Sequence, residues 1–433
     1  MTSEVLTLGS LCEAIIDCEH KTAPVEDEGI PSIRTTDIRG GVIDFKGANK
    51  ISEETYKEWT KRREPKEGDL IFCREAPVGE VGRLRSGERA ALGQRTVLLC
   101  PDQQKVDPRY LHYLLMGYEL QYLMNGWSTG STVAHLNVAD IRKLPIPHIH
   151  NLKDQKFIGG LLDRIDILRQ NLGETSAITE QSISAIFRSW FIDFDPVKAK
   201  AEGKLPYGMN EETAATFPDS FEDSELGPIP TGWRIQYLAD LCDIQRGFSY
   251  TGASLCEQSE GMAMINLASF VEGGGYKHAG LKHVSSEFKE KFYIKQGDVF
   301  IATVDLTPGL RVVGGPLIAP SSLENESIFS QDLLRLRNKT GEKIGRGFLF
   351  HWLKIRRGIL KQWSSGTTVS RFPISALNRY PVLIPPREIL QHFEKIFEYT
   401  QEFSDLSEKK MANLSLTRDS LLPRLMSGEL KVN

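Results

Sequence analysis

The sequence contains one unit twice, and this duplication limits the folds that the chain can adopt. Leu8-Gly-Ser-Leu-Cys returns as Leu238-Ala-Asp-Leu-Cys, and Trp127-Ser-Thr-Gly-Ser returns as Trp363-Ser-Ser-Gly-Thr. Three further matches lie between them in the same order: Gly29-Ile-Pro-Ser-Ile with Gly261-Met-Ala-Met-Ile, Glu67-Gly-Asp-Leu-Ile with Gln296-Gly-Asp-Val-Phe, and Gly93-Gln-Arg-Thr with Phe329-Ser-Gln-Asp. Small changes of offset indicate loop insertions within a shared fold. We therefore expect two similar domains.

Each copy of the unit ends in a long amphipathic stretch. Apolar residues recur every three or four positions, which predicts a helix with one apolar stripe. The first stripe comprises Ile158, Leu161, Ile165, Leu168, Leu172, Ile183, Ile186 and Trp190; the second comprises Ile389, Phe393, Ile396, Phe403, Leu406, Leu414, Leu421 and Leu425. Two such helices in one chain can bury their stripes against each other as an antiparallel pair.

Composition places the chain among globular proteins of more than one domain. It has 433 residues, of which 40% are hydrophobic and 25% charged, and such a length exceeds one ordinary core. No apolar run reaches the roughly 18–20 residues of a membrane helix. No signal peptide is visible at the N-terminus, so we expect a cytoplasmic protein. The six cysteines are scattered, so neither a disulfide framework nor a structural zinc site is expected.

Charge is distributed unevenly along the chain. The connector over residues 191–229 has 3 basic and 9 acidic residues, whereas residues 230–388 have 20 basic and 14 acidic residues. The second domain is therefore basic, which permits phosphate binding without requiring it.

Local patterns predict mixed α/β domains. Short strands are expected at Ile30–Ile33, Gly41–Phe45, Asp69–Cys73 and Thr96–Cys100, and Asp107-Pro opens a helix as N-cap and first residue. We predict an α+β fold in which two similar recognition domains are joined by two long antiparallel coiled-coil helices. The segments are 1–150 (first domain), 151–192 (long helix), 193–233 (acidic, Pro/Gly-rich surface connector), 234–388 (second domain) and 389–433 (second long helix).

The known catalytic motifs do not occur in the sequence. The glycine clusters lack the spacing of a dinucleotide or phosphate-binding loop, and neither G-x-S-x-G nor H-E-x-x-H is found. An amino-methyltransferase needs an Asn- or Asp-Pro-Pro-aromatic loop, and Asn378-Arg-Tyr-Pro does not fit it. We therefore predict no active site and no metal in this chain.

In this order the motifs resemble one family. They are the duplicated Trp-x-x-Gly-[Ser/Thr]-Thr-Val element, Leu144-Pro-Ile-Pro and Leu383-Ile-Pro-Pro before the helices, Phe217-Pro-Asp-Ser-Phe-Glu-Asp-Ser-Glu-Leu-Gly-Pro-Ile-Pro-Thr-Gly-Trp233, and Leu421-Leu-Pro-Arg-Leu-Met-Ser-Gly. Over essentially its whole length the chain resembles the specificity subunit of a type I restriction–modification enzyme.

The resemblance implies a non-catalytic, DNA-binding function. Each domain would read one half of a split, asymmetric site on double-stranded DNA, and the helix pair would fix the spacing between the halves. The helices would dock two methyltransferase subunits, and restriction subunits would join them. S-adenosylmethionine, ATP and Mg²⁺ are expected on those partners, and no cofactor is expected in this chain.

Side chains with two neighbouring hydrogen-bonding groups, such as those of Arg, Asn and Gln, read the edges of bases. Lys, Ser and Thr side chains and main-chain N–H groups bind the phosphates. On that chemistry we predict DNA contacts from loops beside the repeated residues. They are Arg34, Thr35, Arg74, Gln94, Arg95, Ser131 and Thr132 in the first domain, and Arg246, Asn266, Thr303, Arg311, Gln331, Thr367, Thr368 and Arg371 in the second. Two other functions stay open at this point: a self-contained methyltransferase–specificity fusion, and a coiled-coil scaffold for protein interactions.

Overall fold

The computed structural model describes residues 6–128, 134–147, 149–277, 280–305, 309–323, 326–339, 344–365 and 370–431. The chain forms two compact units. Unit 1 comprises Met1–Gly173 and Glu408–Asn433, and unit 2 comprises Glu174–Ser407. Two helices of 40 residues, α5 (Leu152–Phe191) and α11 (Arg387–Met426), each contribute one half to each unit. The predicted long helices are therefore confirmed. The first lies within one residue of its predicted bounds at each end, and the second begins two residues earlier and ends seven residues earlier than predicted.

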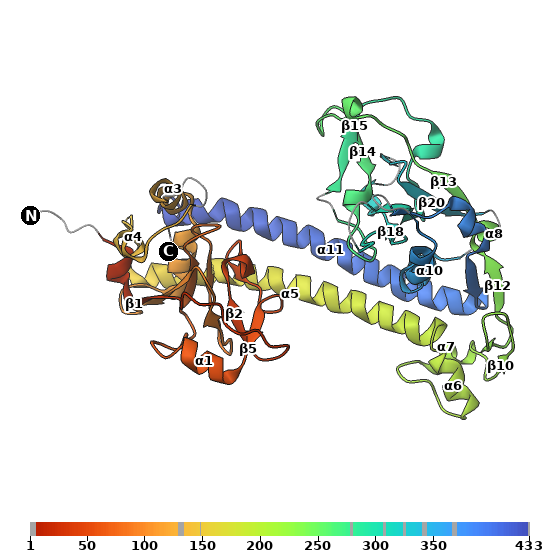
Figure 1. Ribbon diagram of the computed structural model, residues 1–433, viewed down its shortest axis with the longest axis horizontal. Helices are drawn as coiled ribbons and strands as arrows, with labels where there is room; N and C mark the ends of the chain where they lie inside the picture. Colours follow the sequence, from red (N-terminus) through yellow and green to blue (C-terminus); the bar gives the residue numbers. More distant parts are fainter. Residues whose placement is uncertain are drawn as a thin grey trace, which may run out of the picture. The chain divides into compact units, whose positions relative to one another are not determined.

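Unit 1 is built on two small sheets (Figure 1). The antiparallel four-stranded sheet has the order β1-β9-β6-β7, and in the three-stranded sheet β2 pairs antiparallel with β5 and parallel with β8. The strands are β1 (Cys12–Asp17), β2 (Ile30–Ile33), β3 (Ile38–Arg39), β4 (Val42–Ile43), β5 (Asn49–Ile51), β6 (Leu70–Cys73), β7 (Val81–Arg83), β8 (Ala91–Leu92) and β9 (Thr96–Pro101); the helices are η1 (Leu8–Leu11), η2 (Thr35–Asp37), α1 (Glu53–Trp59), α2 (Pro108–Met116), α3 (Tyr118–Trp127) and α4 (Val138–Lys143).

Unit 2 repeats this topology. Its four-stranded sheet has the order β13-β20-β16-β18, and β14 pairs antiparallel with β15 and parallel with β19. The strands are β12 (Arg234–Tyr237), β13 (Cys242–Arg246), β14 (Met262–Ile265), β15 (Lys282–Val284), β16 (Val299–Ala302), β17 (Val304–Asp305), β18 (Pro316–Ile318), β19 (Ser327–Phe329), β20 (Leu333–Asn338), β21 (Ser370–Arg371) and β22 (Pro381–Ile384). The helices are α8 (Leu238–Leu241), η3 (Gly252–Ser254), η4 (Leu267–Ser269), η6 (Glu290–Phe292), η7 (Ser321–Leu323), α9 (Arg346–Ile355), α10 (Arg357–Gln362) and η8 (Ile374–Arg379). The predicted duplication is thus present in the fold.

The strand register corrects one of the sequence matches. In unit 1 Leu70 pairs with Leu99, and in unit 2 Val299, the equivalent of Leu70, pairs with Leu336. Leu99 and Leu336 differ by 237 positions, whereas the match of Gly93 with Phe329 implies 236. A shift of one residue exchanges the two faces of a strand. Gln94 is therefore equivalent to Gln331, and not to Ser330.

The halves of the long helices run antiparallel within each unit. In unit 1 Arg418 of α11 donates to Asp166 of α5 (3.0 Å), and one turn further along α5 Arg169 donates to Ser415 (3.2 Å). In unit 2 Ser176 of α5 lies 3.2 Å from Ser404 of α11, Oγ to Oγ. The predicted apolar stripes are only partly right, because Leu168 and Leu406 are about half exposed and Leu162 is buried instead.

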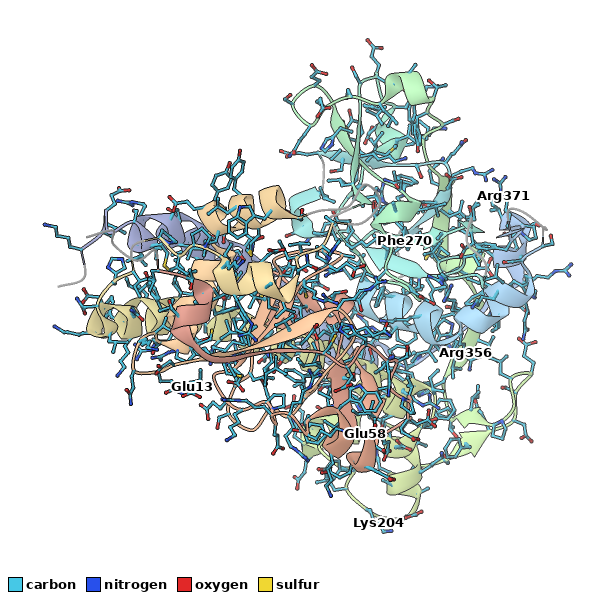
Figure 2. The ribbon with its side chains drawn as sticks, turned by 60° about the vertical axis from the view of Figure 1, so that its left-hand side comes forward. Glu13, Glu58, Lys204, Phe270, Arg356 and Arg371 are labelled. Atoms are coloured by element: carbon cyan, nitrogen blue, oxygen red, sulfur yellow. The ribbon has the colours of Figure 1, made fainter. Side chains whose placement is uncertain are left out.

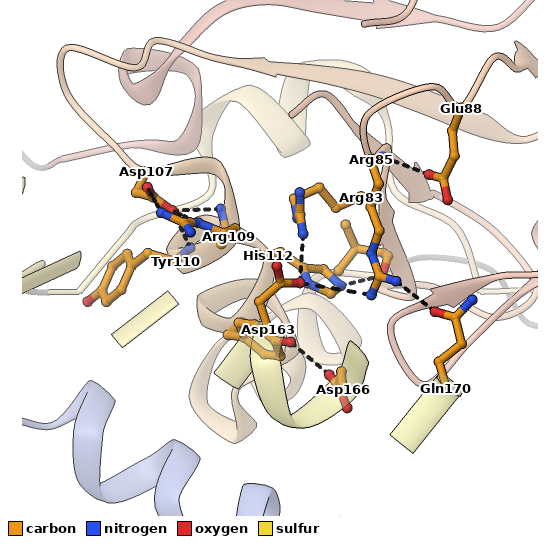
Figure 3. Close-up of polar contacts among 12 residues, drawn as sticks. Arg83, Arg85, Glu88, Asp107, Arg109, Tyr110, His112, Asp163, Asp166 and Gln170 are labelled. Atoms are coloured by element: carbon orange, nitrogen blue, oxygen red, sulfur yellow. Dashed lines mark hydrogen bonds and ion pairs between the residues drawn. The ribbon is translucent and has the colours of Figure 1, made fainter. Parts of the chain in front are cut away.

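In unit 1 the domain packs closely on α5 at a glycine. A Cβ atom on Gly159 would lie 2.6 Å from the main-chain nitrogen of Tyr110 in α2. A polar network extends this contact (Figure 3): Arg83 donates to Asp163 (2.6 Å), Arg85 donates to Gln170 (2.6 Å), and the Tyr113 hydroxyl donates to Asp166 (2.7 Å). These bonds fix the sheet and α2 to one face of α5.

In unit 2 the same junction is mainly aromatic. Phe187 of α5 stacks on His351 of α9, with ring centroids 5.4 Å apart, and lies 5.3 Å from Phe393 of α11. Burial lowers the pKa of His351 to about 4, so its ring is neutral at pH 7. Glu394 of α11 accepts the main-chain N–H groups of Gly347 (3.2 Å) and Phe348 (2.6 Å) at the start of α9.

The connector is more ordered than its composition suggests. It forms α6 (Asp195–Ala201), α7 (Glu211–Ala215), β10 (Phe221–Glu222) and β11 (Ile229–Pro230). Its apolar residues, Val197, Phe217 and Trp233, are buried in the core of unit 2. Trp190 of α5 meets Phe217 edge to face at 5.2 Å. The acidic residues face outward while this apolar minority holds the connector in place. Among the residues that the structure describes, no helix is long and apolar enough to cross a membrane.

Two adjacent glycines of α5 test the close contact in unit 1. Gly159→Ala should lower the free energy of unfolding by about 1–3 kcal/mol, because its Cβ would collide with main-chain atoms that cannot move aside. Gly160→Ala is the matched control: its Cβ would lie 3.4 Å from Nη1 at the far end of the Arg109 side chain and meets no main-chain atom, and alanine favours a helix by up to about 1 kcal/mol. Denaturant unfolding measures both, and equal effects would contradict the proposed contact.

Glu394 makes a pH-dependent contribution to the stability of unit 2. Burial raises the pKa of its carboxyl to about 7, so between pH 4.5 and 7 the unfolded chain has lost a proton that the folded chain still holds. The free energy of unfolding should therefore fall with rising pH across that interval, by at most about 3 kcal/mol. Glu394→Gln keeps a side-chain oxygen that can accept the main-chain N–H groups of α9, and it should remove this pH dependence of the free energy of unfolding. Gln391→Ala, an exposed change on the same helix that removes no titratable group, should leave the slope of stability against pH unaltered.

Candidate nucleic-acid interface

In unit 2 several predicted DNA-contacting residues meet at one end of the four-stranded sheet. β13 ends at Arg246, β16 ends one residue before Thr303, and β20 begins two residues after Gln331; because these strands are antiparallel, all three points lie at the same end. Arg246 Nε donates to the main-chain oxygen of Gln331 (2.9 Å), and Thr303 Oγ1 donates to that of Asp332 (2.8 Å).

Two more arginines belong to this end of unit 2. Arg371 lies in β21, which pairs with β17 directly after Thr303, and its side chain is exposed at the surface (Figure 2). Arg311 is also exposed, and its main-chain oxygen accepts the N–H of Gly273 (3.0 Å). Exposed arginines therefore come from the sheet (Arg246), from the adjoining β17–β21 pair (Arg371) and from the chain before β18 (Arg311).

The equivalent end of the sheet in unit 1 carries arginines that are paired with acids. Arg74 follows β6, and its Nε lies 3.7 Å from Asp17 Oδ1 at the end of β1. Arg95 precedes β9 in a left-handed backbone conformation (φ 67°), and its Nε lies 3.3 Å from Glu75 Oε1. The exposed Gln94 donates to Thr22 Oγ1 (3.0 Å).

Arg34 lies in the adjacent loop of unit 1, directly after β2. It forms a two-pronged pair with Asp37, with Nε to Oδ2 and Nη2 to Oδ1 both at 3.0 Å. The hydrogen bonds to Asp37 raise the pKa of Arg34. The main-chain N–H of Gly93 donates to the oxygen of Ile33 (2.7 Å), which brings this loop beside Gln94.

Three of the predicted residues have buried side chains. Thr35 is 6% exposed, Asn266 5% and Thr303 1%. Asn266 donates to the main-chain oxygen of Gly280 (2.6 Å) and accepts the N–H of Ala268 (2.9 Å). In this structure Asn266 and Thr303 therefore hold the loops in shape. The predicted Ser131, Thr132, Thr367 and Thr368 lie outside the described residues.

Sequence reasoning missed the acidic partners of the unit 1 arginines. Asp37 follows Arg34 by three residues, a spacing that could have indicated a local pair, whereas Asp17 and Glu75 meet Arg74 and Arg95 only through strand pairing. The described residues contain no group of three or more His, Cys, Asp or Glu side chains placed to hold a metal ion. In unit 1 this end of the sheet is therefore a surface of arginine side chains and the carboxylates that pair with them.

Comparisons with known proteins agree with the duplicated fold. The model of the type I restriction modification DNA specificity domain matches residues 230–415. The type I restriction enzyme MjaIX specificity subunit of Methanocaldococcus jannaschii is 24% identical, with 89% of this chain and 83% of that protein covered. The HindI specificity subunit of Haemophilus influenzae is 22% identical, with 84% and 87% covered.

Over most of its length the chain is similar to type I restriction–modification specificity subunits.

Members of this family share the fold found here. The crystal structure of the S subunit from M. genitalium matches with a TM-score of 0.53 and 15% identity, over 98% of this chain and 97% of that one. The predicted resemblance to these specificity subunits and the predicted fold class are confirmed. Specificity subunits are not the catalytic components of these systems, as predicted. The individual DNA-contacting residues stay predictions.

Proposed function

We propose that the chain reads a bipartite DNA site, one half with each domain. The observation that carries this proposal is the duplication of one sheet topology with different side chains at the same end of each copy. The position of Gln94 keeps its residue type in Gln331, whereas Arg34 and Arg74 of unit 1 are replaced by the buried Asn266 and Thr303 in unit 2. Two copies of one scaffold that carry their arginines at different positions would select different sequences, so the complete site would be asymmetric.

The long helices would set the spacing between the two half-sites. A helix of 40 residues is about 60 Å long, whereas half-sites one DNA turn apart are separated by about 34–36 Å. The length of the pair is thus sufficient for both domains to engage one duplex.

The helices would also dock the methyltransferase subunits. Large apolar residues are exposed along them in both units: Phe157, Leu168 and Leu416 in unit 1, and Ile178, Tyr399 and Leu406 in unit 2. An amphipathic helix surface of this kind suits helix-on-helix association. Two methyltransferase subunits with S-adenosylmethionine would flip and methylate the target adenines, and restriction subunits with ATP and Mg²⁺ would join the larger complex.

The chain combined with its methyltransferase subunits should bind duplex DNA with a steep dependence on salt and with selectivity for one split sequence. Arg246→Ala and Arg371→Ala should relax selection in one half-site, which a library of randomised duplexes would measure after methylation. Lys354→Ala, a change on α9, is the control and should preserve both halves. Complexes that select no sequence would contradict DNA reading and favour a scaffold; methyl transfer by the isolated chain would favour the fusion enzyme.

A matched shortening of both helices tests the spacing. Ser176 and Ser404 lie side by side, so deletion of residues 174–180 together with 401–407 removes about two turns, or about 10 Å, from each helix. The selected half-site sequences should persist while the spacer between them shortens by about 3 base pairs, because the duplex rises by 3.4 Å per pair. An unchanged spacer would refute the role of the helices. Deletion of 174–180 alone breaks the pairing and is the control for misfolding.

A further inference from the structure

Arg34 is held in one orientation by a buried acid. Arg34 stands before η2 with extended backbone, and Asp37 is the last residue of that turn. The Asp37 carboxylate accepts three hydrogen bonds from this one residue: from its main-chain N–H (2.9 Å), from Nε and from Nη2 (both 3.0 Å). Asp37 is 6% exposed, whereas the Arg34 side chain is 40% exposed. The acid is thus part of the domain and the guanidinium is at its surface.

The aliphatic stem of Arg34 is fixed as well. A Cβ atom on Gly93 would lie 2.7 Å from Arg34 Cγ, so the stem rests directly on the Gly93 backbone. Gly93 is followed by the exposed Gln94 and Arg95 at the end of the four-stranded sheet. Because both its aliphatic stem and its guanidinium are held, the Arg34 side chain has little conformational freedom. Less conformational entropy is therefore lost when it binds a ligand.

The second domain shows what the turn itself requires. In unit 2 the residues equivalent to Arg34 and Asp37 are Asn266 and Ser269. Ser269 Oγ accepts the main-chain N–H of Asn266 at 3.2 Å, as Asp37 does for Arg34. A serine hydroxyl can therefore take the place of the carboxylate as acceptor of this main-chain N–H. The carboxylate of unit 1 additionally accepts the guanidinium of Arg34, a role that the serine of unit 2 does not have.

We propose that Arg34 reads a guanine in the half-site of the first domain and that Asp37 is its positioning residue. The two bonds to Asp37 use Nε and one hydrogen of Nη2, and they leave Nη1 and the second Nη2 hydrogen for a ligand. Two parallel donors of this kind match O6 and N7 of guanine in the major groove. This inference rests on the proposed function, and it adds the base that one residue selects and the acid that orients it.

The duplication supplies the variant that tests the positioning residue. Asp37→Ser copies the turn of unit 2 and releases Arg34. With the full chain, its methyltransferase subunits and randomised duplexes, Arg34→Ala should reduce the preference for guanine at one position by roughly 10- to 100-fold. Arg34→Lys keeps the charge but not the fork, and should lose the same preference. Asp37→Ser should weaken it at that same position, and should have no further effect when combined with Arg34→Ala.

Thr36→Ala is the control variant. It removes only the hydrogen bond from Thr36 Oγ1 to Asp37 (3.0 Å), and it should leave the guanine preference and the melting temperature unchanged. If the complex with Arg34→Ala still selects the full site, the inference about Arg34 is overturned and the proposed function is not. Asp37→Ser weakening both half-sites equally would likewise overturn it, because that result indicates a structural role. A wild-type complex that selects no sequence would instead overturn the proposed function, and with it this inference.

Discussion

Asp166 joins three parts of unit 1, and its bonds are the interaction on which the placement of the first domain depends. It is 6% exposed and lies on α5. It accepts the Tyr113 hydroxyl from the domain (2.7 Å) and the Arg418 guanidinium from α11 (3.0 Å). A buried carboxylate is costly unless it is paired, and removal of one partner of such a pair costs about 3–5 kcal/mol. The domain and the unit 1 halves of α5 and α11 are therefore held in one fixed arrangement, as the proposed spacing role of the helices would require.

The two units solve the same packing problem with different chemistry. Gly159 of α5 allows the helix backbone to approach the start of α2, which is capped by its own Asp107. At the start of α9 the cap position is Gly345, and the acceptor comes from Glu394 of α11. Hydrogen bonds dominate the first junction and aromatic contacts dominate the second. Duplication preserved the geometry of the junction while its residues changed.

The sequence predicted the architecture well because the duplication and the helical period are strong, repeated signals. It failed where single residues decide. The sequence match of Gly93 with Phe329 was wrong by one residue, because only the pairing of the strands shows that Gln94 corresponds to Gln331. Leu168 and Leu406 fit the helical period, yet they are about half exposed. The period alone does not show which part of a long helix packs against another element. The burial of Asn266 could not be predicted from its side-chain type, because it follows from a contact with Gly280, 14 residues further along the chain; its contact with DNA stays a prediction.

The charges at the two sheet ends indicate that the two domains would bind DNA with different energetics. In unit 1 Arg34, Arg74 and Arg95 each lie against a carboxylate, so their charge is largely balanced before any ligand arrives. Such arginines add little to phosphate attraction, but they are oriented, and orientation favours base selection over non-specific affinity. In unit 2 the described ion pairs include none with Arg246, Arg311 or Arg371, and the domain carries an excess of basic residues. The second domain would therefore supply more of the salt-dependent attraction to the duplex, and the first would contribute mainly to discrimination between sequences.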